Sequence, residues 1–192
     1  ELGEIGNFYG TFGFPPPAED NIRWKKELGG GVLNDVTCYP LYASRLIFQS
    51  EPTSVLAHLQ FDKKFSVDKS ADIILTYPNE KTAFISSGFN RYFQSKYSIW
   101  GSQAKITTKR AYGVPHDYET SIYLHKDDKI IETSIPPAHQ FALMFDIFCN
   151  VISKKIQNPY CFEDDLLAQA KLMESIRISS REKRLVILSE LE

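Results

Sequence analysis

Short strand patterns separated by turn residues fill the middle of this 192-residue chain. The patterns contain many β-branched and aromatic residues, and the gaps contain Pro, Asn, Asp or Gly, which favour the tight turns of antiparallel hairpins. The hairpins pair residues 72–77 with 82–89, residues 97–100 with 104–108, and residues 121–125 with 130–134. Consecutive hairpins of this kind predict a largely antiparallel sheet.

Further strands and two helices surround the hairpins. Residues 5–14, 55–61 and 186–188 have strand character, residues 140–153 form an amphipathic helix, and another helix opens at Glu163. We expect both helices to bury their apolar stripes in the core. These stripes consist of Phe141, Met144, Phe145, Phe148, Val151 and Ile152 in the first helix, and of Leu166, Ala170, Met173 and Ile176 in the second. The order of elements predicts an α+β domain with an open, largely antiparallel or mixed sheet.

Composition excludes several classes of protein. The formal charge of −2 gives no general attraction to nucleic acid or to anionic lipid. No apolar run approaches a membrane span and the N-terminus lacks the layout of a signal peptide, so we expect a cytoplasmic protein. The three cysteines are odd in number and widely spaced, which predicts reduced and mostly buried thiols. The histidines lack the spacing of metal ligands, so no metal site is predicted.

The two ends of the sequence suggest a piece of a longer protein. The chain starts without Met, in the middle of an expected strand, and closes with Leu191-Glu192, a dipeptide that is common as a cloning scar. We interpret residues 1–190 as one domain and residues 191–192 as that scar.

A glycine run followed by an apolar helical segment is the best candidate for a functional site. Gly29, Gly30 and Gly31 allow positive φ and close approach, and Asp35 and Tyr39 stand four apart just after them. On a helix, this carboxylate and phenol would share one face and could meet one substrate. A tight entry turn and a surface hydrogen bond are the alternative explanation. The run fits neither the dinucleotide fingerprint nor the P-loop.

The same segment contains a helix-breaking residue and a predicted packing face. We expect a kink at Pro40, or a second helical piece starting there, because proline lacks the N–H of an uninterrupted helix. Ala43, Leu46 and Ile47 are predicted to pack on the sheet.

The order of these motifs resembles a known family. The sequence Asn-Ile-Arg-Trp at 21–24, the run Glu-Leu-Gly-Gly-Gly-Val-Leu-Asn-Asp-Val at 27–36 and Tyr39 are similar to the C-terminal domain of the glucose-fructose oxidoreductase, inositol dehydrogenase and MocA family. Residues 99–106, the His-Gln-Phe sequence at 139–141 and Glu-Asp at 163–164 support the resemblance, which covers nearly the whole chain.

The resemblance implies a function and a division of labour. Family members bind NAD or NADP in an N-terminal Rossmann domain, where a Glu-Lys-Pro motif supplies a catalytic lysine. This chain would then be the substrate-binding half of an NAD(P)-dependent oxidoreductase that acts on a sugar, nucleotide sugar or polyol. The resemblance assigns Tyr39 as the proton donor or acceptor during hydride transfer and Asp35 as an orienting group. It implies that the turn of Gly29, Gly30 and Gly31 is adjacent to the cofactor, beside the nicotinamide site.

The resemblance also implies an architecture. It predicts helices packed on one face of the sheet, and a homo-oligomer formed through the other face.

Three further residues are weaker substrate-binding candidates. Arg23 could pair with a phosphate or carboxylate, Trp24 could stack on a sugar, and Gln140 could reach the pocket from its helix. A surface ion pair, packing on the sheet and a helix-start hydrogen bond are the respective alternatives. A different function also stays open, namely a non-catalytic sheet domain used for oligomerisation or ligand binding. The upstream coding sequence would discriminate, because an enzyme needs a nucleotide-binding turn and the Glu-Lys-Pro motif.

Overall fold

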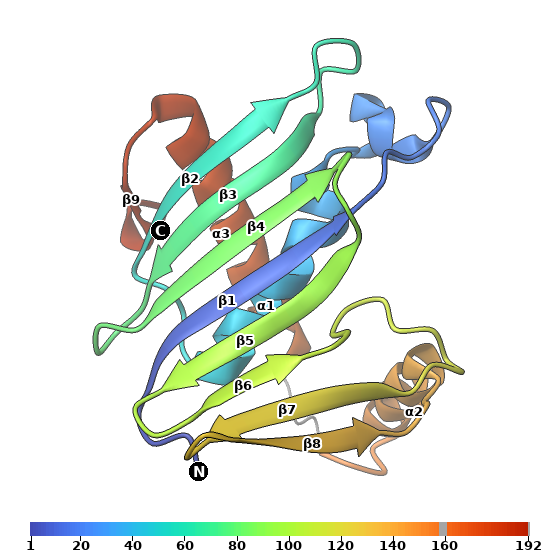
Figure 1. The fold of residues 1–192 in the computed structure, drawn as a ribbon. Helices are drawn as coiled ribbons and strands as arrows, with labels where there is room; N and C mark the ends of the chain where they lie inside the picture. Colours follow the sequence, from blue (N-terminus) through green and yellow to red (C-terminus); the bar gives the residue numbers. More distant parts are fainter. Residues whose placement is uncertain (158–160, 192) are drawn as a thin grey trace.

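The computed structural model describes residues 1–157 and 161–191, in which an open sheet carries helices on one face (Figure 1). The nine strands lie in the order β8-β7-β6-β5-β1-β4-β3-β2-β9. They are β1 (Ile5–Phe14), β2 (Ser54–Phe61), β3 (Asp68–Thr76), β4 (Thr82–Phe89), β5 (Gln94–Gly101), β6 (Lys105–Thr108), β7 (Thr120–Lys126), β8 (Lys129–Ile135) and β9 (Val186–Ile187). The longer helices are α1 (Cys38–Phe48), α2 (Gln140–Ile152) and α3 (Phe162–Glu182). The predicted fold class is confirmed.

The pairing of the strands makes the sheet mixed. β1 runs parallel to β4 and antiparallel to β5, and the other neighbouring strands pair antiparallel. The predicted hairpins are β3–β4, β5–β6 and β7–β8, so all of them are confirmed. The last predicted strand is also present, as β9 on the edge beside β2. None of the described helices has the length and apolar character of a membrane span.

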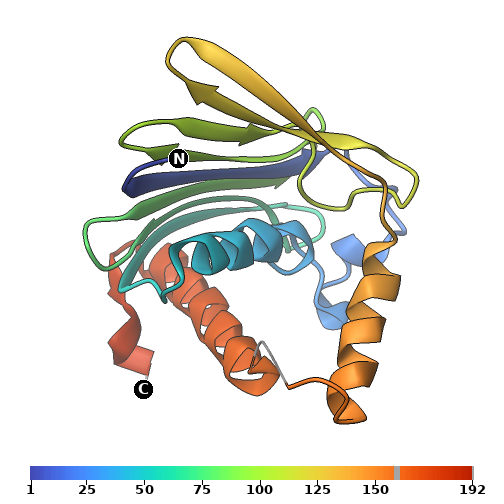
Figure 2. The ribbon, with the colours of Figure 1, turned by 90° about the horizontal axis from the view of Figure 1, so that it is seen from below.

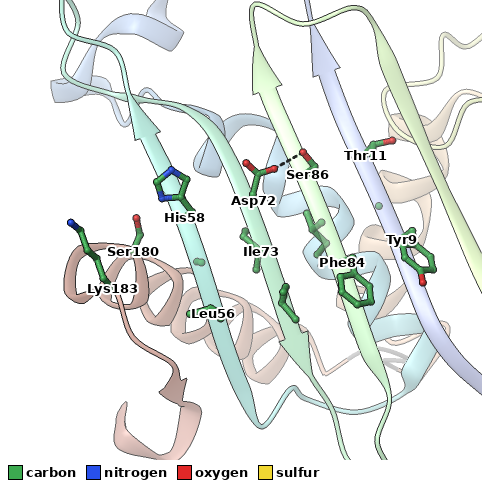
Figure 3. Close-up of a pocket in the computed structure, with 14 residues that line it drawn as sticks. Tyr9, Thr11, Leu56, His58, Asp72, Ile73, Phe84, Ser86, Ser180 and Lys183 are labelled. Carbon is green, nitrogen blue, oxygen red and sulfur yellow. Dashed lines mark hydrogen bonds between the residues drawn. The ribbon is translucent and has the colours of Figure 1, made fainter.

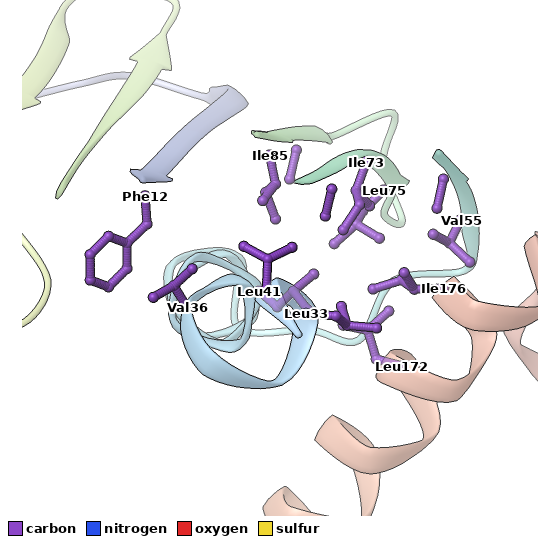
Figure 4. Packing of buried hydrophobic residues seen from close by; sticks show 14 of the residues in the cluster. Phe12, Leu33, Val36, Leu41, Val55, Ile73, Leu75, Ile85, Leu172 and Ile176 are labelled. Carbon is purple, nitrogen blue, oxygen red and sulfur yellow. The ribbon is translucent and has the colours of Figure 1, made fainter. Parts of the chain in front are cut away.

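The hydrophobic core lies between the sheet and two helices. Figure 2 shows α1 and α3 on the same side of the sheet, whereas no described helix covers the other side. In Figure 4, Leu41 of α1 and Ile176 of α3 meet Ile73 and Ile85 from the strands, and all four side chains are buried. Gly10 permits the close approach of α1 to β1, since a Cβ on this residue would lie 2.6 Å from the Cβ of Pro40.

The predicted packing faces of the two core helices are correct only in part. Ile176 is fully buried, and Ala43, Ile47 and Met173 pack against the core. In α1, Leu46 is 58% exposed, and the buried side consists of Pro40, Leu41, Ser44, Arg45 and Phe48. In α3, Leu166 is 73% exposed and Ala170 is also exposed, while the buried residues are Leu172, Ser175, Ile176 and Ser179.

Hydrogen bonds from the sheet explain the burial of serine in α3. The hydroxyls of Ser179 and Ser180 accept bonds from the backbone N–H groups of Ala57 and Leu59, at 3.0 and 2.9 Å. The short edge strand β9 pairs only with Ser54 and Val55 of β2. The two serine hydroxyls thus provide acceptors for N–H groups farther along β2, which β9 does not reach. Helix α3 therefore approaches β2 with small polar residues, which a pattern of apolar periodicity does not register.

Helix α2 contradicts its predicted core position. No residue of α2 is buried, and its apolar residues Phe141, Met144, Phe145, Phe148 and Ile152 are 46–63% exposed. The neighbouring strand β8 is exposed along its whole length. Figure 2 shows the reason, because α2 stands at the edge of the molecule, away from the core beneath the central strands.

The cysteines are free, but they are less buried than predicted. Cys38 is half-buried, and Cys149 and Cys161 are exposed. Cys149 lies in α2 and Cys161 immediately precedes α3, so both belong to the part of the chain that lies outside the core.

Candidate functional site

Neighbouring protein atoms fill the space around Gly30 and Gly31 of the glycine turn. Gly29 adopts a left-handed conformation with φ 75°, and a Cβ on Gly30 would lie 2.6 Å from the carbonyl oxygen of Arg23. Gly31 has φ 117°, and a Cβ there would collide with the carboxylate of Asp68 from β3. That carboxylate accepts a hydrogen bond from Leu33 N at 2.6 Å. The glycines are therefore required by the packing of this turn against residues 23–25 and Asp68.

A π-helical turn then positions the candidate residues. Residues Leu33–Thr37 are π-helical, and α1 follows from Cys38. Pro40 is the third residue of α1, so the expected break occurs just before it, where the helix changes register. The Thr37 hydroxyl donates to the carbonyl oxygen of Val32 at 3.0 Å, which supports the wide turn. π-helical turns of this kind are frequent at functional sites.

Arg23 and Asp35 form an ion pair. Arg23 Nε donates to Asp35 Oδ2 at 2.6 Å, and the two side chains are 36% and 22% exposed. Arg23 is fixed locally because its backbone N–H bonds to Asn21 Oδ1 at 3.0 Å and its guanidinium lies 5.7 Å from the centre of the Phe14 ring. This charge pair borders the half-exposed phenol of Tyr39, whose pKa responds to both of its members.

Tyr39 is held by aromatic rings and stays protonated at neutral pH. Its ring meets Phe12 edge-on at 5.6 Å and lies 6.1 Å from Tyr112. Burial raises the pKa of Tyr39 above its usual value, Cys38 and Asp35 raise it further, and Arg23 lowers it. Burial also raises the pKa of the Cys38 thiol to about 11, with a smaller contribution from Asp35. The phenol is therefore ready to donate a proton, and it needs additional positive charge to accept one.

A cavity of about 390 Å³ opens beside Tyr39, between α1 and β5. Four phenol-bearing residues line it, Tyr39 and Tyr42 from α1, Tyr97 from β5 and Tyr112 from the loop after β6. We call it the tyrosine cavity. The rest of its lining consists of Cys38 and aliphatic side chains.

Tyr97 and Tyr112 were not predicted as site residues, because only the sheet brings them next to α1. Neither residue has a spacing relative to Tyr39 that could have indicated the contact.

The other two predicted substrate residues lie elsewhere. Trp24 is buried, stacks on Phe65 at 4.8 Å and donates from Nε1 to the carbonyl oxygen of Pro17 at 3.1 Å. This is the packing position considered as its alternative. Gln140 is exposed at the start of α2, and its amide donates to the carbonyl oxygen of Val114 at 3.4 Å. The structure therefore groups Arg23 with Asp35 and Tyr39.

The open face of the sheet carries a second and larger concavity, of about 870 Å³ (Figure 3). Two rows of side chains cross it from strand to strand. An apolar row consists of Leu56, Ile74, Phe84 and Tyr9, and the adjacent polar row consists of His58, Asp72, Ser86 and Thr11. The Ser86 hydroxyl donates to Asp72 Oδ1 at 2.6 Å. Within residues 1–157 and 161–191, no cluster of His, Cys, Asp and Glu could hold a metal ion.

Comparison with known proteins places this arrangement in a family context. The family model described as the GFO/IDH/MocA C-terminal domain matches residues 1–107. The match therefore covers the glycine turn, the π-helical turn, α1 and the first six strands apart from the end of β6.

Individual relatives extend the similarity along the chain. The dTDP-3,4-didehydro-2,6-dideoxy-alpha-D-glucose 3-reductase of Saccharopolyspora spinosa is 29% identical over 181 residues, which is 92% of this chain and 54% of the relative. A D-xylose 1-dehydrogenase (NADP(+)) of Haloferax volcanii is 24% identical and covers 79% of this chain and 47% of the relative. The chain thus spans about half the length of the curated relatives it matches.

A solved structure supports the same relationship. KijD10, a 3-ketoreductase from Actinomadura kijaniata in complex with NADP and TDP-benzene, superposes with a TM-score of 0.85 at 26% identity. The similarity covers 93% of this chain and 55% of KijD10.

Proposed function

This chain belongs to the GFO/IDH/MocA C-terminal domain family, and from that premise we propose that it is the substrate-binding half of an NAD(P)-dependent oxidoreductase acting on a sugar, nucleotide sugar or polyol. The relatives support this reading, since their names describe a reductase of a dTDP-linked deoxy sugar and a xylose dehydrogenase. Within the full-length protein, residues 1–190 would serve as the substrate-binding and oligomerisation domain.

The observation that carries the proposal is the grouping of Arg23, Asp35 and Tyr39 at the start of α1. An ion pair of 2.6 Å places one positive and one negative charge beside an accessible phenol. The pKa of that phenol is sensitive to both charges, so the arrangement suits controlled proton transfer better than packing alone.

In this mechanism the chain contributes proton transfer. During reduction, the Tyr39 phenol donates its proton to the substrate carbonyl oxygen, and during oxidation it takes up the hydroxyl proton. A bound nicotinamide supplies or accepts the hydride. Because burial raises the pKa of Tyr39 and Arg23 is already paired with Asp35, the oxidative direction requires another cation. The lysine of the family's Glu-Lys-Pro motif would meet this requirement.

We propose that the glycine turn of this chain does not bind the dinucleotide. The turn at Gly30 and Gly31 is filled by the backbone of residues 23–25 and by Asp68, so its backbone is not open to a pyrophosphate. We therefore assign the binding of NAD or NADP to a half outside this chain. Calorimetric titration of the 192-residue chain with NADH and NADPH should show no tight binding, and micromolar affinity for either would contradict this assignment.

A second copy of the protein is the proposed partner of the open sheet face. The apolar row across this face is 37–44% exposed, which leaves a continuous apolar strip in water. In a twofold dimer the same strip would pack against itself. Light scattering at low concentration should give a dimer or larger assembly, and Phe84→Lys should dissociate it. A monomeric parent protein would refute this part of the proposal.

The function is tested on the full-length protein. We expect nicotinamide-dependent turnover with at least one substrate in a panel of free sugars, polyols and nucleotide sugars. An assembly without turnover for any of them, in a protein that lacks the Glu-Lys-Pro lysine, would instead favour the non-catalytic sheet domain.

A further inference from the structure

We propose that Asp68, the first residue of β3, is a positioning residue that fixes the start of the helical segment carrying Asp35 and Tyr39. We call residues 33–48, the π-helical turn together with α1, the site segment. The inference rests on the proposed function for the role of Tyr39 in proton transfer. It adds a residue that lies outside the motif of the glycine run, Asp35 and Tyr39.

The site segment has no cap from its own sequence. It begins at Leu33, and the preceding residue, Val32, has no side-chain oxygen that could accept the N–H groups at this end. The carboxylate of Asp68 provides that acceptor, because the backbone N–H of Leu33 donates to its Oδ2 at 2.6 Å. A carboxylate at the first turn of a helix also interacts favourably with the helix dipole. The sheet therefore supplies the cap that the neighbouring sequence does not.

The capped turn joins the backbones of the ion pair. The N–H of Gly31 donates to the carbonyl oxygen of Arg23 at 3.0 Å, and the carbonyl oxygen of Gly31 accepts from the N–H of Asp35 at 3.2 Å. Asp68 packs directly against Gly31, where a Cβ would collide with its carboxylate. The Arg23 and Asp35 side chains then meet at 2.6 Å. Asp68 thus holds the residue through which both members of the pair are connected.

The Asp68 carboxylate is partly buried at this position. Burial raises the pKa of Asp68, whereas the N–H of Leu33 and the positive charge of Arg177 oppose this rise. A buried carboxylate costs free energy unless it is hydrogen-bonded, so the bond to Leu33 offsets part of that cost. Arg177 of α3 also donates from Nη2 to Asn34 Oδ1 at 2.7 Å. The start of the site segment is therefore bound to the sheet through Asp68 and to α3 through Asn34.

The position of Tyr39 depends on the position of this segment. Its ring lies 5.6 Å from the ring of Phe12 and 6.1 Å from that of Tyr112, and neither partner belongs to the segment. A shift of the segment therefore moves the phenol relative to both rings. A displacement of about 1 Å can lower the rate of a chemical step by about 10²-fold. Burial is the largest cause of the raised pKa of Tyr39, so a loosened segment should lower this pKa toward its usual value.

The first experiment measures the position of Tyr39 without any activity. In the 192-residue chain with labelled aromatic rings, nuclear Overhauser effects should connect Tyr39 to Phe12. Asp68→Ala should weaken or remove them, and Asp68→Asn should preserve them because it keeps an acceptor oxygen. Asp62→Ala is the matched control and should leave them unchanged. Its carboxylate also accepts backbone N–H bonds, at 2.8 and 3.2 Å, but from residues in the loop between β2 and β3.

The second experiment measures the chemical step in the full-length protein. Asp68→Ala should lower the single-turnover rate by about 10- to 10²-fold, with a smaller change in KM, because the proton donor is displaced. The alkaline limb of the pH–rate profile for reduction should move to lower pH, since the pKa of Tyr39 falls. Asp68→Asn should stay closer to the parent protein, and Asp62→Ala should match it. A variant that is only less stable would keep the parental pH profile.

The outcomes separate this inference from the proposed function. Parental Overhauser effects in Asp68→Ala, equal effects of Asp62→Ala, or a parental rate in Asp68→Ala where Tyr39→Phe is slow would each overturn the inference. Gly31→Ala displaces the same carboxylate and replaces Asp68→Ala if that variant does not fold; parental Overhauser effects in it would overturn the inference too. If Tyr39→Phe turns over like the parent while Asp68→Ala still moves the ring, the positioning stands and the proton-transfer role is removed.

Discussion

Replacing Tyr39 with Phe removes one oxygen at the centre of the proposed site. The aromatic contacts to Phe12 and Tyr112 involve the ring, so the variant keeps them. Tyr39 is 48% exposed, and the loss of its hydroxyl should change the free energy of unfolding by no more than about 0.5 kcal/mol. For a chain of this size the melting temperature should then move by less than about 2 °C.

Turnover should respond far more strongly than stability. A positioned acid or base contributes about 10² to 10⁴ in rate, which corresponds to about 2.7 to 5.4 kcal/mol of transition-state stabilisation. The assay follows reduced nicotinamide by absorbance in the full-length enzyme, under single-turnover conditions that isolate the chemical step. Tyr92→Phe is the control, because the same atom is removed from a side chain that is 88% exposed in the loop between β4 and β5.

The outcome separates two readings of Tyr39. If the residue only packs at the start of α1, its Phe variant will turn over like the parent and like Tyr92→Phe. That result would refute its role as the proton donor. A loss of turnover with an unchanged melting temperature would support the role.

Three further predictions concern charge, local stability and the glycine turn. Arg23 lowers the pKa of Tyr39 and Asp35 raises it. Arg23→Gln should therefore move the alkaline limb of the pH–rate profile for reduction to higher pH, and Asp35→Asn should move it to lower pH. Shifts of the two variants in the same direction would contradict this prediction. Since α2 buries no residue, its amides in the isolated chain should lose hydrogen-exchange protection well before those of α1, and equal protection of the two helices would contradict this prediction. Gly31→Ala introduces a side chain at φ 117° against Asp68 and should cost about 1–3 kcal/mol in chemical denaturation, whereas Gly6→Ala, where a Cβ would meet nothing closer than 4.0 Å, should be nearly neutral.

Local sequence signals were sufficient to predict the strands and the helical segment that follows the glycine run. The turn residues fixed the hairpins because proline, asparagine and glycine restrict the backbone within a few residues. The same locality explains why Asp35 and Tyr39 were found together. Their spacing reflects one turn of helix, even though the turn is π-helical at Asp35.

Burial was less predictable than secondary structure. Leu46, Leu166 and the stripe of α2 apart from Val151 are exposed in spite of their apolar periodicity, whereas Ser175 and Ser179 are fully buried. Periodicity identifies a face that can pack, but the partner surface decides whether it does. The sheet offers such a surface to α1 and α3 beneath its central strands and β2, and it offers none to α2 within the described residues.

The sequence by itself therefore determined the local elements, the hairpin order and the Asp35–Tyr39 pair, because each depends on residues close together in the chain. Tertiary structure decided which helix faces are buried, that Arg23 pairs with Asp35, and that Tyr97 and Tyr112 meet α1. The contact of Tyr112 with Tyr39 and Phe12 depends on the order of the strands, in which β1 lies between β4 and β5 in a pairing that no local pattern encodes. The tyrosine cavity is lined by α1, by β5 and by the loop after β6, so it follows from the arrangement of these elements in the fold and not from any motif.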